Sequence, residues 1–313
     1  MFTLRQYLLA LLDSRGLTRT LGEIDVCRDE QGRPCFSAGN SAAVFRIRLG
    51  GRIRSLRCYL RPMRHLKEIY GQRLLEKELY LHTSPETGVW VDTVLGDWIE
   101  GSTLHETVAQ AAALRDRESL QILVRLFDRL ALALVTDDRA HGDLKPENII
   151  VGDDGTLCPI DFDASYLPAF AGEISPELGT AAYQHPARTA ADFDERIDDY
   201  PAALISTALH ALAEDPTLWD RYGSSDGLLY TPQRIASDPA YRETLALFEK
   251  RGMAVQYRIA QLLTAPTLRL FGLAELLAEA VREKPAARSG TEAETPELFV
   301  ENGRWGYRTA ERV

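Results

Sequence analysis

The spacing of hydrophobic residues changes from a strand-like to a helical period about a third of the way along the chain. An initial helix is predicted over residues 1–15, because leucines recur there on one side. From Gly22 to Leu60 the chain has short β-like runs, "CFSAG", "AVFRIRL" and "SLRCYL", separated by the turn sequences "DEQG" and "LGG". A helix over roughly 62–76 and strands near "LYLHT" and "VWVDTVL" follow. The pattern predicts a small sheet with one helix against it.

Helical spacing predominates after "WIEGSTL". The stretch "ESLQILVRLFDRLALALVTDD" carries one apolar face, formed by Leu120, Leu123, Phe127, Leu130 and Leu134. Further helices are predicted at 198–213, 239–251, 254–264 and 272–283. We therefore expect the second part of the chain to be mainly helical and to have its own core.

The composition is that of an ordinary globular protein, with 45% hydrophobic and 26% charged residues among 313. The 46 acidic residues outnumber the 36 Lys and Arg, and the net charge of -10 argues against nucleic acid as a partner. No run approaches the roughly 20 apolar residues of a membrane-spanning helix. The four cysteines are scattered and include no C-x-x-C pair, which favours reduced thiols in a cytoplasmic protein.

The stretch "HGDLKPENII" (His141–Ile150) places an acid, a base and an amide just before an apolar run. Beyond it, "IIV" and "LCPI" flank the turn sequence "GDDG", which predicts an antiparallel hairpin. Such a hairpin brings Asn148, at the head of its first strand, next to Asp161, at the end of its second. An amide oxygen and a carboxylate so placed suit Mg²⁺, which usually takes one or two protein ligands together with waters and phosphate oxygens.

Two charged side chains of the same stretch extend this hypothesis. Asp143, five residues before Asn148 across a tight loop, can face the same point and accept a proton from an attacking hydroxyl. Lys145 can offset charge on a transferring phosphoryl group. Taken singly, an Asp-x-x-x-x-Asn or "DFD" sequence usually reflects a turn or a strand end. Their joint spacing across a hairpin favours phosphoryl transfer.

These residues resemble the eukaryotic-type protein kinase superfamily, in a divergent form of bacterial type. The catalytic loop H-R-D-L-x-x-x-N and the metal-binding D-F-G of that family have the order and separation of "HGDLKPEN" and "DFD". The resemblance covers approximately residues 36–283 and implies ATP and Mg²⁺ as cofactors. The resemblance further implies that Asp143 is the catalytic base and that Lys145 is the cation that faces the phosphates. Asn148 and Asp161 are the metal ligands.

The resemblance also implies the architecture. We expect an α+β, bilobal, protein-kinase-like fold with a small β-rich N-lobe and a larger, mainly helical C-lobe. The expected segments are a helical extension at 1–21, the N-lobe at 22–99, the C-lobe at 100–283, a linker at 284–297 and a truncated β-rich unit at 298–313. The last segment contains "ENGRWGYRT", which resembles the opening of a WG repeat, so a longer native protein is expected.

The segment "GTAAYQHPAR" resembles the end of a kinase activation segment. In Ser/Thr kinases the equivalent of Thr180 hydrogen-bonds the equivalent of Lys145, so this pair implies a Ser or Thr hydroxyl as acceptor. "DDYPAALISTAL" resembles the helix that follows, with Asp199 in the position whose carboxylate holds the backbone of the catalytic loop. A helix N-cap at Asp198 or Asp199 would explain the same acidic residues.

The nucleotide-binding motifs are matched only in part. "SAGNSAAVFRIRL" stands where the Gly-rich loop belongs and keeps only Gly39 and Val44 of that motif. "RSLR" replaces V-A-I-K and puts Arg57 where the family has a lysine that holds the α- and β-phosphates. Arginine keeps the charge, but its planar fork needs a different approach to phosphate. If the alignment of "RSLR" with the family's V-A-I-K motif is shifted, Arg57 is an ordinary solvent-exposed residue without a role in binding.

Two further positions complete the implied nucleotide site. Glu68 is preferred to Glu76 as the carboxylate partner of the cation, because it follows the strand after a short connection; both are expected on the 62–76 helix. "WIEGSTL" resembles the hinge, where main-chain groups from about Gly96 to Ile99, those of Trp98 included, are expected to hydrogen-bond adenine. An ordinary strand-to-helix turn would have the same sequence.

Two substitutions bear on regulation and on substrate. Gly142 replaces the Arg of H-R-D, which leaves no cation beside Asp143 to receive an activation-loop phosphate, so control by loop phosphorylation is not expected. Asp163 replaces the Gly of D-F-G and removes the most permissive backbone position of that turn. "HGD" together with "DFD" is also similar to the aminoglycoside phosphotransferase branch, whose members phosphorylate small molecules.

Three functions remain open from the sequence. The first is an ATP-dependent protein Ser/Thr kinase that uses Mg²⁺ and an Asp base and acts on a protein substrate. The second is a pseudokinase, which binds nucleotide or a partner protein without turnover, as Arg57 in place of lysine allows. The third is a small-molecule kinase. Thr180 and the "GTAAYQHP" segment favour the first over the third.

Overall fold

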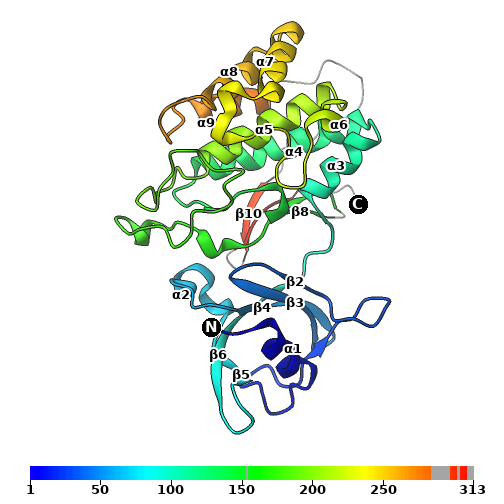
Figure 1. The fold of residues 1–313 in the computed structure, drawn as a ribbon, viewed down its shortest axis with the longest axis vertical. Coiled ribbons are helices and arrows are strands. Elements are labelled where there is room, and N and C mark those ends of the chain that lie inside the picture. The colour runs from blue at the N-terminus through cyan, green and yellow to red at the C-terminus, as the bar shows by residue number, and fades with distance from the viewer. Residues whose placement is uncertain (153, 283–296, 302–303, 309–313) are drawn as a thin grey trace. The chain divides into compact units, whose positions relative to one another are not determined.

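The computed structural model describes residues 1–152, 154–282, 297–301 and 304–308. The chain forms two compact units, Met1–Ile99 and Glu100–Val313. The first is built on an antiparallel sheet, and the second consists mainly of helices (Figure 1). This mixed α and β architecture is compatible with the expected bilobal fold. Within the described residues no helix combines the length and the apolar character needed to cross a membrane.

The sheet of the first unit has the strand order β1-β3-β4-β6-β5, and β2 also pairs with β3. All pairings within it are antiparallel. Most pairs are hairpins of strands adjacent in sequence, as the short turn sequences predict. The strands are β1 (Asp25–Val26), β2 (Phe36–Ala38), β3 (Ala42–Leu49), β4 (Arg52–Tyr59), β5 (Leu74–His82) and β6 (Gly88–Asp97).

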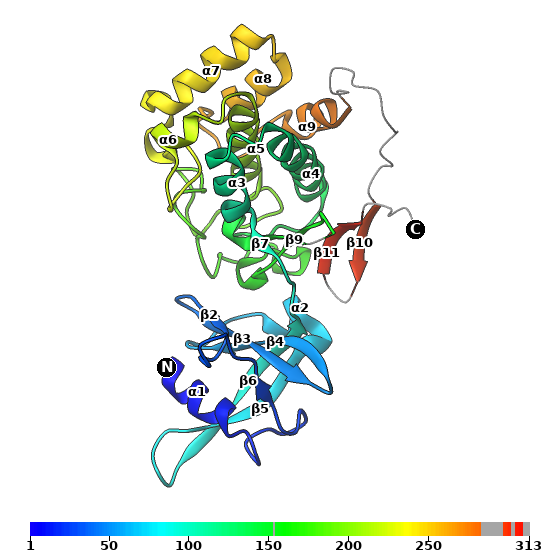
Figure 2. The ribbon, with the colours of Figure 1, turned by 90° about the vertical axis from the view of Figure 1, so that its right-hand side faces the viewer.

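Helix α1 (Leu4–Leu12) packs on one face of this sheet (Figure 2). It begins at a capping box, in which Thr3 and Gln6 satisfy each other's backbone N–H groups. Tyr7 and Leu11 are fully buried, whereas Leu9 is 63% exposed. The predicted helix is present, but its buried face includes Tyr7 and only some of the leucines.

The buried carboxylate of Glu78 on β5 fixes the chain that follows α1. Its Oε1 accepts hydrogen bonds from the backbone N–H groups of Arg19, Thr20 and Leu21, at 3.1, 2.8 and 2.8 Å. Tyr7 adds a second anchor, because its hydroxyl donates to the carbonyl oxygen of Tyr59 at 2.6 Å. The first 21 residues are therefore anchored to the sheet of the first unit, and Tyr7, Ala10 and Leu11 are part of its core.

The predicted helix over 62–76 is wrong in its length. The structure has only α2 (Leu66–Tyr70) and the short 3₁₀ turn η1 (Gly71–Arg73) before β5 begins. Gly71 ends α2 with a φ of +52°. The residues beyond it pair with β6 instead, and Leu79 and Leu81 alternate into the core of the sheet.

In the second unit α4 and α5 lie side by side and form the centre of the core (Figure 2). The apolar face predicted for α4 is buried, and α5 is buried along almost all of its length. Five helices agree closely with the predicted bounds: α4 (Arg117–Thr136), α5 (Asp199–Glu214), α7 (Pro239–Arg251), α8 (Ala254–Leu262) and α9 (Leu273–Arg282). Helices α3 (Leu104–Ala113) and α6 (Leu218–Tyr222) had no predicted bounds.

Short elements connect these helices. A three-stranded antiparallel sheet has the order β7-β8-β9, with β7 (Ser102–Thr103), β8 (Ile149–Val151) and β9 (Leu157–Pro159). The 3₁₀ turns are η2 (Pro146–Asn148), η3 (Phe162–Ala164), η4 (Pro168–Phe170) and η5 (Pro232–Ser237). At the end of the chain β10 (Glu297–Glu301) pairs antiparallel with β11 (Arg304–Arg308). The predicted linker lies outside the described residues except for Glu297.

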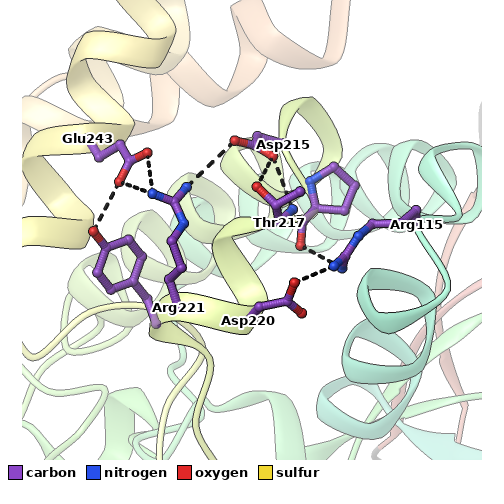
Figure 3. A network of polar contacts seen from close by, with 8 residues as sticks. Arg115, Asp215, Thr217, Asp220, Arg221 and Glu243 are labelled. Atoms are coloured by element: carbon purple, nitrogen blue, oxygen red, sulfur yellow. Dashed lines mark hydrogen bonds and ion pairs between the residues drawn. The ribbon is translucent and has the colours of Figure 1, made fainter.

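Ion pairs join α6 to its neighbours in the second unit, as Figure 3 shows. Arg221 on α6 makes two contacts of 2.8 Å with the carboxylate of Glu243 on α7. Arg115, just after α3, donates to the carboxylate of Asp220 on α6. These side chains are partly exposed, so each pair contributes at most about 1 kcal/mol to stability.

Candidate active site

The predicted hairpin is present in the second unit. β8 and β9 pair antiparallel around the "GDDG" turn, with Ile149 opposite Pro159. The pairing continues one step beyond the strands, because the N–H of Ile160 donates to the carbonyl oxygen of Asn148 at 2.8 Å. Asp161 is the next residue, so the register places its backbone one position beyond the pair formed by Asn148 and Ile160.

Two hydrogen bonds fix the side-chain amide of Asn148. Its Nδ2 donates to the carbonyl oxygen of Asp143 at 2.9 Å and to the carboxylate Oδ2 of the same residue at 3.1 Å. Both partners are acceptors, so the amide orientation follows from its bonds. The amide oxygen Oδ1 is then the atom of Asn148 that can bind a cation.

The carboxylate of Asp143 is held by three groups. Oδ1 accepts a hydrogen bond of 2.6 Å from the backbone N–H of Thr180. Oδ2 accepts from Asn148 and lies 3.3 Å from Nζ of Lys145. Lys145 in turn donates to the hydroxyl of Thr180 at 2.8 Å. The Lys145–Thr180 contact that the sequence suggested is therefore present in the structure.

His141 connects the loop to the second strand of the hairpin. Its Nε2 lies 2.7 Å from the carbonyl oxygen of Ile160 and therefore carries the proton, while Nδ1 accepts from the N–H of Asp143 at 3.3 Å. The imidazole also packs on Phe162, with ring centroids 5.0 Å apart. The two segments "HGD" and "DFD" are thus linked through one buried ring.

The residue that holds the loop backbone is Asp198 and not Asp199. The carboxylate of Asp198 accepts from the N–H of His141 at 2.5 Å and from the N–H of Gly142 at 3.0 Å. Asp198 is fully buried, and burial raises its pKa. Asp199 turns instead toward the N–H of Leu270, and neither aspartate caps α5 through its side chain.

Three residues of the site have a left-handed backbone conformation. Asp161 has a φ of +67°, which aspartate tolerates better than most residues with a Cβ. Gly142 has a φ of +81°, and Gly179 has a φ of +72°. A Cβ on Gly179 would lie 2.7 Å from the carbonyl oxygen of Gly142, so only glycine allows the downstream segment to approach the loop this closely.

Two cationic side chains lie close to Asp143, although glycine stands at position 142 in place of the family's arginine. The Lys145 ammonium is within salt-bridge distance, and the guanidinium of Arg188 is hydrogen-bonded to the preceding residue, Gly142. Sequence reasoning did not single out Arg188, because it lies in no part of the motifs that define the loop. Only its place at the end of the quoted segment "GTAAYQHPAR" could have drawn attention to it.

Val44 and Arg57, predicted to bind nucleotide, are direct cross-strand neighbours in the sheet of the first unit. Paired residues share a face of the sheet. The next pair along, Phe45 and Leu56, is fully buried on the face that α1 covers. Val44 and Arg57 therefore lie on the face away from α1.

The other residues predicted for nucleotide binding are also in the first unit. Gly39 forms the tight β2–β3 turn, donating its N–H to the carbonyl oxygen of Ala42 at 2.9 Å, and it needs no positive φ. Glu68 is exposed in the first turn of α2. Glu76 lies on β5 and not on a helix, 3.8 Å from Lys67.

Trp98 and Ile99, predicted to form the hinge, follow directly after β6. The guanidinium of Arg46 on β3 lies over the indole ring of Trp98, 5.7 Å from its centroid. Arg46 is two residues from Val44 and shares its face of the sheet. This face thus carries Arg46 and Arg57 and, by the same alternation, Arg48.

Known proteins show a weak similarity to this chain. No protein-family model matches it. CBL-interacting protein kinase 17 of Oryza sativa subsp. japonica is 28% identical over 172 residues, which are 52% of this chain and 35% of that protein. Serine/threonine-protein kinase PknL of Mycobacterium tuberculosis is 34% identical over 113 residues, which are 34% of this chain and 27% of that protein. The matches support a kinase-like phosphotransferase in the broad sense.

The donor set of the hairpin fits one divalent cation with few protein ligands. Asn148 offers an amide oxygen, and Asp161 offers a carboxylate, both of them ligand types that Mg²⁺ accepts. Within the part of the chain that the structure describes, no cluster of three or more His, Cys, Asp or Glu side chains could hold a metal. A closed zinc-type site is therefore absent from these residues.

Proposed function

We propose that the chain is an ATP-dependent phosphotransferase, most simply a protein Ser/Thr kinase, whose catalytic loop is His141–Asn148. One observation carries this proposal: the carboxylate of Asp143 is held at both oxygens, by Thr180 and by Asn148. A carboxylate fixed in this way can accept a proton in a defined direction. The weak similarity to protein kinases supports the same reaction class.

In the proposed reaction Asp143 orients the acceptor hydroxyl and accepts its proton as the oxygen attacks the γ-phosphorus of ATP. The bond from the γ-phosphorus to the bridging oxygen breaks, and ADP leaves. Lys145, held between Asp143 and Thr180, places a positive charge near the transferred group. Asn148 Oδ1 and the carboxylate of Asp161 would hold Mg²⁺. The cation, when bound, supplies neutralisation of phosphate charge.

The proposed nucleotide partners in the first unit are Gly39, Val44, Arg57, Glu68, Trp98 and Ile99. Support comes from the cross-strand register of Val44 and Arg57, which puts both on one face of the sheet. The proposed acceptor is a Ser or Thr hydroxyl of a protein. It is supported by the 2.8 Å bond from Lys145 to Thr180, the contact that the resemblance to Ser/Thr kinases implies.

Nucleotide binding without turnover is the second candidate. It is favoured by Arg57, whose planar guanidinium replaces the point charge of the family's lysine at the strand position paired with Val44. The two candidates differ in one measurable quantity, the rate of phosphoryl transfer from bound ATP.

The test compares wild type with Asp143→Asn in transfer of labelled phosphate from ATP to a generic protein acceptor. Removing the base should lower kcat by at least about 100-fold, with ATP affinity little changed. Asp116→Asn is the matched control, because Asp116 caps α4 and asparagine caps equally well. Equal rates for wild type and Asp143→Asn would overturn the role of Asp143. ATP binding without any transfer by wild type would establish the second candidate.

A further inference from the structure

Arg188 lies in the segment between η4 and α5 and is buried, with only 9% of its surface exposed. Its Nη1 donates to the carbonyl oxygen of Gly142 at 3.0 Å and also to Oε1 of Gln184. Arginine is rarely buried unless its charge or its donors are needed. The position of this guanidinium, one residue before Asp143, therefore calls for a physical reason.

The backbone of Gly142 is held from two sides. Its N–H donates to Oδ1 of Asp198, and its carbonyl oxygen accepts from Arg188. The next residue is Asp143, whose Oδ1 is held by the N–H of Thr180. Three groups from distant parts of the sequence thus fix the short stretch of backbone that carries the proposed base.

Gly142 itself cannot supply a side chain for this purpose. Its φ is +81°, and a Cβ would lie 2.0 Å from the carbonyl oxygen of Ala164. The positive charge is brought instead by Arg188, 46 residues further along the chain. The guanidinium of Arg188 can therefore lie next to the catalytic loop although residue 142 is glycine.

The hydrogen bonding of Arg188 is incomplete. Its Nε and Nη2 are buried and have no hydrogen-bond partner within the described residues. Burial lowers its pKa, against the opposing effect of Asp198 and Asp143. A buried guanidinium with unused donors contributes little to folding compared with an apolar side chain of similar size. A role at the loop explains its presence better than a contribution to stability.

We propose that Arg188 is a positioning residue for Asp143: it holds the Gly142 carbonyl and docks residues 179–188 onto the catalytic loop without a phosphorylated side chain. This inference rests on the proposed function of Asp143. This docking needs no modification of the chain, because the guanidinium of Arg188 donates directly to the carbonyl oxygen of Gly142. Treatment with phosphatase should accordingly leave the activity of the wild type unchanged.

The main experiment compares Arg188→Met and Arg188→Lys with wild type in phosphoryl transfer. Methionine fills the space without a donor, so kcat should fall about tenfold or more while KM for ATP stays within about twofold. Lysine can reach the carbonyl with one donor and should restore most of the lost kcat. The melting temperature of Arg188→Met should stay within about 3 °C of wild type.

Arg196→Met is the matched control. Arg196 is a partly buried arginine of the same unit, and its Nη1 donates to a carbonyl oxygen, that of Val135, at 2.6 Å. This substitution should leave kcat unchanged. An unchanged kcat in Arg188→Met overturns the proposal. A loss of kcat and melting temperature together, without rescue by lysine, also overturns it, because that result describes a merely structural residue.

Hydrogen exchange separates failure of this inference from failure of the proposed function. In Arg188→Met the amides of Gly142 and Asp143 should exchange at least about tenfold faster than in wild type, with exchange in α4 and α5 unchanged. This result would support the positioning of the loop even if wild type and Asp143→Asn were equally inactive. Unchanged exchange at the two amides would overturn the inference whatever the activity.

Discussion

Gly142 has a φ of +81°, which residues with a Cβ rarely adopt, and a Cβ there would lie 2.0 Å from the carbonyl oxygen of Ala164. Both effects act against any substitution. Gly142→Ala should therefore lower the free energy of unfolding by more than about 2 kcal/mol, measured by denaturant titration. Gly39→Ala is the control, because its Cβ would meet nothing closer than 3.9 Å. Equal stability of the two variants would contradict this reading of the loop.

The pairing of the strands that carry Asn148 and Asp161 could be predicted from the sequence, because a short turn between two apolar runs fixes the register of a hairpin. The choice between Asp198 and Asp199 could not. The two carboxylates are adjacent at the start of α5. A shift of the helix start by one residue would exchange the directions of the two side chains and so decides which of them meets the loop. Arg188 was missed for a related reason, since its partner is 46 residues away.

Strand β5 and the segment after α1 are joined through Glu78. Its Oε1 accepts hydrogen bonds from three backbone N–H groups of that segment. Glu78→Ala removes the side-chain acceptor of the N–H groups of Thr20 and Leu21 in a partly buried place, whereas the N–H of Arg19 keeps its 2.9 Å bond to the carbonyl oxygen of residue 78. The free energy of unfolding of the first unit should fall by roughly 2–4 kcal/mol. Glu76→Ala, on the same strand but exposed, should change it by less than about 1 kcal/mol. A comparable loss in both variants, measured by urea unfolding, would refute the anchor.

The first turn of α5 contains Asp199, whose pKa is raised to about 7 by burial. Because this value lies above that of the unfolded chain, the folded state binds an extra proton between about pH 4 and pH 7. The contribution of Asp199 to stability is therefore present at low pH and is lost as the pH rises toward 7, by at most about 1.4 kcal/mol per pH unit.

Asp199→Asn should remove this dependence. Asparagine keeps the size of the side chain but cannot ionise, so stability between pH 5 and 7 should fall less steeply than in wild type. Urea unfolding at three pH values measures the slope, and Asp154→Asn, in the exposed β8–β9 turn, serves as the control. Parallel slopes in wild type and Asp199→Asn would show that the buried carboxylate does not titrate in this range.

At the scale of elements, the long periodic helices could be predicted almost to their ends, whereas α2 could not. The α4 pattern has nine buried positions at helical spacing, which only a helix satisfies. The residues beyond Gly71 have good helix propensity too, but pairing with β6 buries Leu79 and Leu81 and outweighs it.

For the whole molecule, the change from strand to helical spacing near residue 100 falls at the division between the two units. Each unit has its own core, one around the antiparallel sheet and one around α4 and α5. The proposed base and metal ligands are all in the second unit, and Arg57 is in the first.

The β8–β9 hairpin is proposed to hold Mg²⁺ between Asn148 and Asp161, and calorimetric titration with ATP in the presence and absence of Mg²⁺ tests this most directly. Asp161→Asn is the informative variant, because asparagine tolerates the φ of +67° but lacks the charge. Asp154→Asn, on the same hairpin, is the control. Wild type and the control should bind ATP with Mg²⁺-dependent heat, and Asp161→Asn should bind at least about tenfold more weakly. Equal Mg²⁺-dependent affinities in all three proteins would contradict the proposed site.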